Sequence, residues 1–575
     1  MSPQKTWGRS QRPVVRANRH AVSAGHPMAA LAGFQVLEAG GNAIDAGVAT
    51  ALATNVLQSE LTGIAGIAPA VVYLADSGKV ISVQGNSAWP KLASCEYFHK
   101  HHGGEIPLGI LESQTPAAVD AYLTALEHFG TMSFTEVAAA AIRFARDGFP
   151  MYPLLAQLID EKPMPWPTTR KHFKPEGRAP EVGESFVQAE LGSTIQFLAD
   201  EESKAAKKGR VAGLKAVHDA FYKGDIARKI DTFYRENGGL VRYEDLAEYR
   251  GGLIEPLKTR FMDMDIHAYP PGGVMFLESL NILGDFDLEA MGHNTPSYIH
   301  TLTEAFKLAF ADREAYVGDP DFVDVPWDTL LSPAFAAQRR DKIDPDKAWP
   351  DMPAPGDVGR GSPAAAGGAP GTPDQERQTS ADAGTSYCCA VDGHGNAFSC
   401  MISGGNANAP VVPGTGFGLA HFGISSFTDP SHANCVAPGK RMRSGGPAMM
   451  VQNGERVMPF GTPGSDVIPQ AMTQVLLNMF VFGMDPQVAV ESSRFATYSC
   501  PALFFPHDYV PGELKIEATL AKKVGQALVD VGHKVVEWPD RIWRAASVCA
   551  IIRESDTGLI QGAADNRRDA YVIGW

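Results

Sequence analysis

The chain has 575 residues, of which 44% are hydrophobic and 20% are charged, and its net charge is -15. This composition is that of a globular protein long enough to bury a sizeable core, and it argues against a disordered or fibrous chain. The negative balance repels phosphate backbones and anionic lipid headgroups, so we expect neither nucleic acid nor a membrane as a partner.

The first thirty residues are basic and polar and lack the apolar core of a secretory signal. Since no run of roughly 18 apolar residues occurs either, we expect a cytoplasmic protein. Three histidines, His99, His101 and His102, precede Gly103-Gly104 in an apparent loop and indicate a solvated face rather than a metal site. The Cys residues show no CxxC spacing, which favours reduced thiols in the core; they are Cys95, Cys388, Cys389, Cys400, Cys435, Cys500 and Cys549.

Two closely packed helices are predicted from Met28 to Leu57, where small and apolar residues recur at helical spacing around a break at Gly40-Gly41. Between Ala68 and Gly85, two β-rich runs flank Asp76-Ser77-Gly78 and predict a hairpin. Helical periodicity returns in four later segments, the last with Ser297 as its expected cap: Ala117–Phe129, Phe134–Ala145, Met275–Leu288 and Ser297–Ala311.

From 350 to 384 the chain is too poor in large apolar residues to offset its ordering entropy, and we expect a mobile tether. Directly after it, Tyr387–Val391 and Ala397–Ile402 predict a second hairpin. Farther on, a strand at Arg456–Phe460, a glycine turn and a helix at Ile468–Phe482 form an arrangement that exposes backbone N-H groups.

Thr385 stands where the tether ends and the strand begins. If the Gly384-Thr385 bond were cut, Thr385 would carry a hydroxyl nucleophile and its own α-amine as the adjacent base. A mobile segment tolerates such a cut without unfolding of the rest. This position therefore predicts an amide-cleaving enzyme that first cuts itself.

Four segments in this order resemble motifs of the gamma-glutamyltranspeptidase family, a branch of the N-terminal-nucleophile hydrolases: Gly40–Ala46, Gly63–Gly66, Thr385–Asn396 and Gly461–Ser465. The resemblance implies an α/β (α+β) fold of four layers, αββα, with two stacked antiparallel sheets. It also implies a large region, 1–384, and a small region, 385–575, intertwined in one structural domain. Gly63 and Gly66 are assigned to a glycine-rich loop, with close backbone approach as the structural alternative.

The same resemblance assigns the catalytic residues. Thr385 attacks first the Gly384 carbonyl and then the substrate, the backbone N-H groups of Gly464 and Ser465 form the oxyanion hole, and Ser403 stands where the family has a threonine that bonds the nucleophile's amine. Typical members have glycine in place of Ser465, but a backbone donor survives that change. No metal or organic cofactor is implied, the partners are a small substrate and the chain's own fragments, and a homodimer stays open.

Departures from the family pattern concern the substrate. The family's carboxylate-binding Arg matches Asn86 here, its ammonium-binding Asp matches Ser426, and its paired serines are reduced to Ser444. Arg441 and Arg443 are either substitute carboxylate ligands or surface partners of acidic side chains. Because loss of the guanidinium weakens carboxylate recognition, we expect an enzyme that does not favour glutathione. The segments Pro438–Arg441 and Gly562–Arg567 resemble the oxamate amidohydrolase and cephalosporin acylase branch.

The predicted function is therefore a self-processing Thr amidohydrolase or acylase that works through an acyl-Thr385 intermediate. Three alternatives stay open: a γ-glutamyl transferase or glutathione hydrolase, a C-C bond hydrolase of secondary metabolism, and an uncleaved binding protein. The sequence does not decide between water and an amine as the acyl acceptor. A phosphate-binding role is disfavoured because Gly461–Gly464 lacks the Lys of a P-loop.

Overall fold

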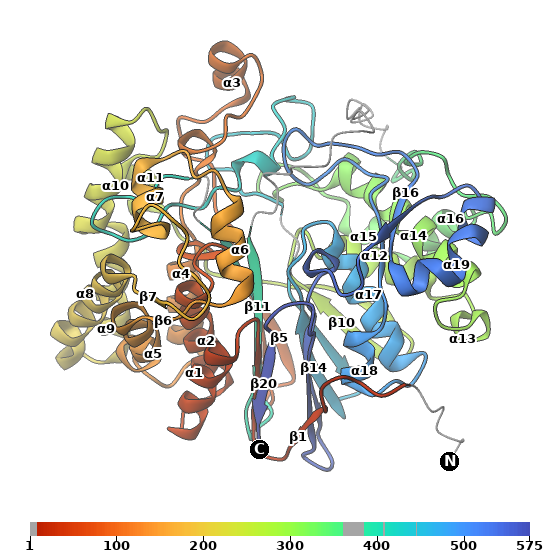
Figure 1. The fold of residues 1–575 in the computed structure, drawn as a ribbon, viewed down its shortest axis with the longest axis horizontal. Helices are drawn as coiled ribbons and strands as arrows, with labels where there is room; N and C mark the ends of the chain where they lie inside the picture. The colour runs from red at the N-terminus through yellow and green to blue at the C-terminus, as the bar shows by residue number, and fades with distance from the viewer. Residues whose placement is uncertain (1–7, 360–383, 406–408, 444–445) are drawn as a thin grey trace.

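Helices cover both outer faces of two stacked β-sheets, as the computed structural model shows for residues 8–359, 384–405, 409–443 and 446–575 (Figure 1). The first helical group lies on the left of Figure 1 and the second on the right, with both sheets between them. The predicted four-layer α+β architecture is thereby confirmed. Most of the predicted tether and Ser444 lie outside the described residues.

The sheet under the first helical group has eight antiparallel strands, with β3 paired to β12 beside the main path. In spatial order they are β20 (Tyr571–Gly574), β2 (Ala21–Ala24), β11 (Thr385–Val391), β12 (Ala397–Gly404), β4 (Ala70–Leu74), β5 (Lys79–Val83) and β8 (Leu253–Ile254), with β3 at Thr62–Ile67. This sheet contains strands from before and from after Gly384, and β2, from before it, lies between β20 and β11, from after it.

The second sheet has seven strands: β1 (Val15–Ala17), β19 (Ile560–Ala564), β18 (Cys549–Glu554), β14 (Arg456–Gly461), β13 (Ala448–Gln452), β10 (Met264–Ala268) and β9 (Leu257–Phe261). It too mixes strands from before and after Gly384. Two small sheets complete the set: β15 (Phe495–Thr497) with β16 (Glu513–Glu517) and β17 (Lys534–Trp538), and β6 (Phe149–Pro150) with β7 (Ser185–Phe186).

The helices divide by chain region. The first group comprises α1 (Pro27–Glu38), α2 (Ala43–Leu57), α3 (Cys95–His102), α4 (Ala118–Phe129), α5 (Phe134–Asp147), α6 (Pro153–Glu161), α7 (Pro167–Phe173), α8 (Ala189–Ala205), α9 (Arg210–Tyr222), α10 (Asp225–Glu236) and α11 (Tyr243–Glu248). The second comprises α12 (Val274–Leu283), α13 (Leu288–Met291), α14 (Pro296–Tyr316), α15 (Trp327–Leu330), α16 (Pro333–Arg340), α17 (Val467–Phe480), α18 (Pro486–Glu491) and α19 (Ala518–Asp530).

Alternation along β11 shows why this strand lies in the centre. Cys388 and Ala390 pack into the core beneath α1 and α2, whereas Tyr387, Cys389 and Val391 pack between the two sheets. Both faces are buried, since successive side chains of a strand point to opposite sides. The strand that begins at Thr385 is therefore held from both sides.

The Gly-Gly-Asn-Ala-Ile-Asp-Ala motif has a structural role. Asn42 caps α2 by accepting from the N-H groups of Ile44 and Asp45, and Asp45 in turn accepts from the Asn42 N-H, which completes a capping box. All residues of α2 are buried. A Cβ at Gly47 would lie 2.0 Å from the Phe398 ring of β12, so α2 packs directly on the central hairpin.

The predicted hairpins, Ala70–Leu74 with Lys79–Val83 and Thr385–Val391 with Ala397–Gly404, are confirmed. Three other expectations are wrong in detail. The helix expected from Ser297 is capped by Thr295; Gly63–Gly66 lies in strand β3, not a loop; and the three histidines lie in the last turn of α3. Ser94 caps that helix and Gly103 ends it in the left-handed conformation, which favours glycine.

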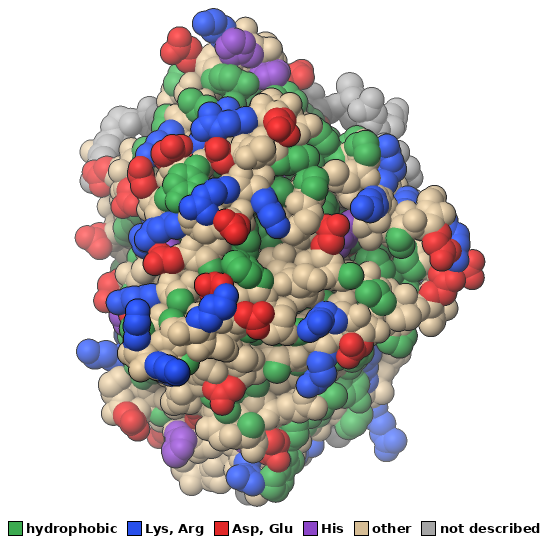
Figure 2. All heavy atoms as spheres, turned by 90° about the vertical axis from the view of Figure 1, so that its left-hand side faces the viewer, with side chains coloured by type: hydrophobic (Ala, Val, Ile, Leu, Met, Phe, Trp, Pro, Cys, Tyr) green, Lys and Arg blue, Asp and Glu red, His purple; other side chains and the backbone are tan. Residues whose placement is uncertain are grey.

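The outer face of the first helical group shows acidic and basic side chains interspersed (Figure 2). Within the described residues, none of the helices has the length and apolarity needed to cross a bilayer.

Candidate active site

Thr385 and Ser403 face each other at one end of the central hairpin. They are register partners in β11 and β12, and their hydroxyl oxygens lie 2.7 Å apart. Ser403 Oγ also lies 2.5 Å from the Gly384 carbonyl oxygen, which accepts a second hydrogen bond from the Gly404 N-H at 3.4 Å. Ser403 thus lies within hydrogen-bonding distance of both the Thr385 hydroxyl and the Gly384 carbonyl.

The direction of these bonds follows from what each atom can donate. A carbonyl oxygen only accepts, so the single Ser403 proton is directed at Gly384. Ser403 must then accept from the Thr385 hydroxyl. Ser403 can therefore receive a proton from Thr385 while it polarises the Gly384 carbonyl.

The hairpin turn fixes this register. Asp392 Oδ1 accepts from the N-H groups of His394 and Asn396, and Asp392 Oδ2 accepts from the Asn396 amide and from the Ala43 N-H of α2. A shift by one residue would break these bonds and would move every side chain to the opposite face. The turn therefore holds Thr385 opposite Ser403.

Glycines permit the close backbone contacts around the cleavage bond. A Cβ at Gly384 would lie 2.0 Å from the Leu61 Cα, and one at Gly66 would lie 2.0 Å from the Ser403 carbonyl oxygen. Such distances exclude any side chain unless the backbone moves. Glycine at position 66 is therefore explained by the close approach of β3 to β12.

The turn after β14 lies at the same end of the sandwich. Gly461 packs against the Tyr387 ring, two residues beyond Thr385, and the chain then reaches Gly464 and Ser465 ahead of α17. Gly464 has φ +138° and Ser465 has φ +53°. Ser465 is thus held in the left-handed region, where a non-glycine residue costs about 1 kcal/mol or more.

Three of the predicted substrate residues, Asn86, Ser426 and Arg441, are linked through the segment 86–89. Asn86 donates its amide to the Met442 carbonyl at 3.3 Å, the Trp89 indole donates to Ser426 Oγ at 2.9 Å, and Ala88 forms a bridge with Arg441. The Arg441 guanidinium pairs with Asp321 at 2.7 Å, and its backbone N-H donates to Asp319. These contacts match the interpretation of Arg441 as a partner of acidic side chains rather than as a substrate ligand.

A buried charge cluster lies behind Ser465. Arg443 pairs with Glu314 at 2.5 Å, and Arg313 pairs with both Glu314 and Asp466. Burial alone would raise the pKa of the Glu314 carboxyl, but Arg443 and Arg313 hold it well below its usual range. The cluster borders a cavity of about 20 Å³, the space of roughly one water molecule. This cavity is too small for an acyl group.

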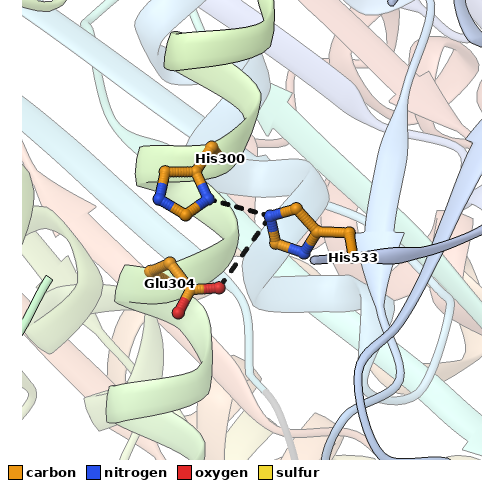
Figure 3. Close-up of side chains that lie close together, drawn as sticks. All are labelled: His300, Glu304 and His533. Atoms are coloured by element: carbon orange, nitrogen blue, oxygen red, sulfur yellow. Dashed lines mark hydrogen bonds and ion pairs between the residues drawn. The ribbon is translucent and has the colours of Figure 1, made fainter. Parts of the chain in front are cut away.

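Within the described residues, one group of side chains has the residue types and spacing of a metal site. His300, Glu304 and His533 are buried, with ligand atoms within 4.8 Å of one another (Figure 3). However, His300 donates from Nε2 to the Asp344 carbonyl and accepts at Nδ1 from His533, and the Lys307 ammonium lies 2.7 Å from Glu304. A cation there would face that ammonium. The donor set therefore fits a hydrogen-bonded network rather than a metal centre.

Comparison with known proteins gives the family. The family model described as gamma-glutamyltranspeptidase matches residues 29–575. The chain belongs to the gamma-glutamyltranspeptidase family. It is 30% identical to the acylase ACY 1 proenzyme of Pseudomonas sp. (strain SE83), over 97% of this chain and 93% of that one.

Two further relatives of this family member are named for different activities. The glutathione hydrolase-like YwrD proenzyme of Bacillus subtilis (strain 168) is 28% identical, over 97% of this chain and 99% of that one. The crystal structure of cephalosporin acylase from Bacillus halodurans has a TM-score of 0.83 and 30% identity, covering 100% of this chain and 99% of that one. The chain is thus an enzyme of the N-terminal-nucleophile hydrolase type, related to both acylases and glutathione hydrolases.

Arg568 is a site residue of this gamma-glutamyltranspeptidase-family enzyme that the sequence analysis missed. It donates to the Thr385 carbonyl oxygen at 2.9 Å, and its guanidinium lies 5.1 Å from the centre of the Trp543 ring. The resemblance of the C-terminal tail ended at Arg567, one residue earlier. The doubled arginine was the available signal, but only the fold shows which of the two reaches Thr385.

We expect an Arg568→Met substitution to slow cleavage after Gly384 by about 10- to 100-fold, because a charge-assisted hydrogen bond contributes about 1.5–3 kcal/mol. The measurement is the fraction of cut chain over time on a denaturing gel. Arg260→Met, at an exposed position of strand β9, is the control. Cleavage of the Arg568 variant at the parental rate would contradict this role.

Proposed function

We propose that this enzyme is a self-processing Thr amidohydrolase or acylase, which cleaves an amide or related acyl bond of a small non-γ-glutamyl substrate through an acyl-Thr385 intermediate. The observation that carries the proposal is the contact of Thr385, Ser403 and the Gly384 carbonyl. Relatives named acylase and proenzyme support it.

Maturation follows from the hydrogen bonds. Thr385 Oγ1 attacks the Gly384 carbonyl carbon and gives its proton to Ser403, while Ser403 passes its own proton to the Gly384 carbonyl oxygen, which also accepts from the Gly404 N-H. When the C-N bond breaks, that proton moves to the Thr385 nitrogen and the carbonyl re-forms, so that Gly384 becomes an ester on the Thr385 hydroxyl. Water hydrolyses this ester and frees region 385–575 with Thr385 at its N-terminus.

In turnover the freed α-amine, with an ordinary pKa near ~7.7–8.0, accepts the Thr385 hydroxyl proton. The hydroxyl attacks the substrate carbonyl, and the N-H groups of Gly464 and Ser465 stabilise the oxyanion. The leaving group takes the proton, and water then releases the acyl group from Thr385. The acyl-enzyme is shared by amide cleavage, acyl transfer and C-C bond cleavage, so substrate tests decide among them.

Substrate preference is tested with three p-nitroanilides that differ by one group at a time: γ-glutamyl, glutaryl, which lacks the amine, and butanoyl, which also lacks the carboxylate. Because Asn86 supplies an amide bonded to Met442 where a guanidinium would bind the carboxylate, we expect kcat/KM for the γ-glutamyl compound to be within about tenfold of the butanoyl value. A γ-glutamyl preference of a hundredfold or more would establish the glutathione hydrolase alternative instead.

A further inference from the structure

Two thiols from distant parts of the chain meet beside the substrate residues. Cys95 is the first residue of α3, and Cys435 lies in the loop between Ser426 and Arg441. Cys95 Sγ lies 3.2 Å from the Val436 carbonyl oxygen and 4.0 Å from the Phe427 carbonyl oxygen, and Cys435, directly before Val436, forms a bridge with Phe427. Both are partly exposed, whereas the five other cysteines are buried.

The surroundings favour a thiolate at Cys435. The Lys440 ammonium lies 3.5 Å from Cys435 Sγ and is itself held by the Ala433 carbonyl at 2.7 Å. The neighbouring Cys95 thiol and the charge of Lys440 lower the pKa of Cys435 to about 6, and the pKa of Cys95 is raised by its coupling to Cys435 and by burial. By contrast, burial raises the pKa of Cys388, Cys389 and Cys549. A thiolate with a neighbouring thiol is the arrangement of a reactive dithiol.

We propose that Cys95 and Cys435 form a redox-active dithiol that a low-molecular-weight disulfide oxidises to an intramolecular disulfide. The Cys435 thiolate attacks one sulfur of the small disulfide, forms a mixed disulfide and releases one small thiolate. Cys95 then loses its proton and attacks the Cys435 sulfur, which releases the second small thiol. Two electrons pass from the dithiol to the small disulfide, and the proton that Cys95 loses leaves with the second small thiol, whereas the first is released as a thiolate.

The bond would join α3 to the loop that carries two of the proposed substrate residues. Trp89, which precedes α3 in the chain, is already bonded to this loop, since its indole donates to Ser426 and its backbone N-H donates to the Lys440 carbonyl at 2.9 Å. The Phe427 ring, stacked on His432 and His507 at 3.6 and 3.8 Å, anchors the start of the loop. Oxidation would therefore restrict motion on the substrate side while Thr385 and Ser403 stay untouched.

The first test is alkylation by iodoacetamide at pH 6, read by peptide mass mapping. About half of Cys435 is thiolate there, against about 0.3% of a thiol with pKa 8.5, and its lower intrinsic nucleophilicity reduces the advantage to about tenfold. We expect Cys435 to react about tenfold faster than N-acetylcysteine in the same tube and to lose this advantage in Lys440→Met. Labelling no faster than that of N-acetylcysteine would overturn the proposal.

The second test is incubation with oxidised glutathione, followed by non-reducing peptide mapping. We expect a Cys95–Cys435 cross-linked peptide, and in Cys95→Ala a mixed glutathione disulfide that stays on Cys435. A lasting mixed disulfide in the parent protein, or no reaction at all, would overturn the dithiol. Neither test reads acyl transfer or cleavage, so their outcome is independent of the function proposed above.

Discussion

A Thr385→Ala variant is expected to stay a single chain of 575 residues and to show no measurable turnover. The substitution removes the hydroxyl of the residue that directly follows Gly384 and that is bonded to Ser403. Loss of a nucleophile commonly lowers kcat by about 10⁶-fold, and here it would also block maturation. The measurement is a denaturing gel with intact mass, beside hydrolysis of the p-nitroanilide series.

Thr385→Ser is the matched control, because it keeps the hydroxyl and deletes one methyl group. It should still give fragments 1–384 and 385–575, at a changed rate. Ser386→Ala, one residue along the same strand, should mature normally. A Thr385→Ala protein that is cut after Gly384 and turns over substrate would refute the assignment of the nucleophile.

A Glu304→Gln variant is expected to lose about 3–5 kcal/mol of folding stability, because it leaves the buried Lys307 ammonium without its negatively charged partner. Both side chains are fully buried, and Lys307 is bonded to Glu304 and to the Trp349 carbonyl, each at 2.7 Å. Gln keeps the size of the side chain and an oxygen for the Trp349 N-H, so the lost charge is the main change. Thermal and urea denaturation measure the effect.

The stability of the Glu304→Gln variant should depend on pH. Burial already lowers the pKa of Lys307, and loss of the Glu304 charge lowers it further. The unfolded chain then binds more protons than the folded one between the two pKa values, so the variant should regain stability as the pH rises toward 10. The double variant Glu304→Gln/Lys307→Met should be less damaged than the single one at pH 7. Equal loss in both would show that packing, not the unpaired charge, is responsible.

The central hairpin was predictable because its signals are local: period-2 alternation from Tyr387 and turn residues at Asp392–Asn396. The contact of Thr385 with Ser403 follows once that register is known. Arg568 was not predictable, because it reaches Thr385 across 183 residues through the packing of the C-terminal segment. Helix α3 was missed because its histidines suggested a loop, although Ser94 and Gly103 carry capping signals.

The interleaving of strands on the two sides of Gly384 has a consequence for recovery after denaturation. Strands β2 and β12 flank β11 in one large sheet, and β10 and β13 are neighbours in the other, so neither region contains all the strands of either large sheet. Once the bond is cut, two separate polypeptides would have to find each other before either could refold. Renaturation of the mature enzyme would become second order in concentration, whereas that of the precursor is first order. After maturation the enzyme would thus depend on kinetic stability, which is set by a slow unfolding rate, rather than on reversible folding.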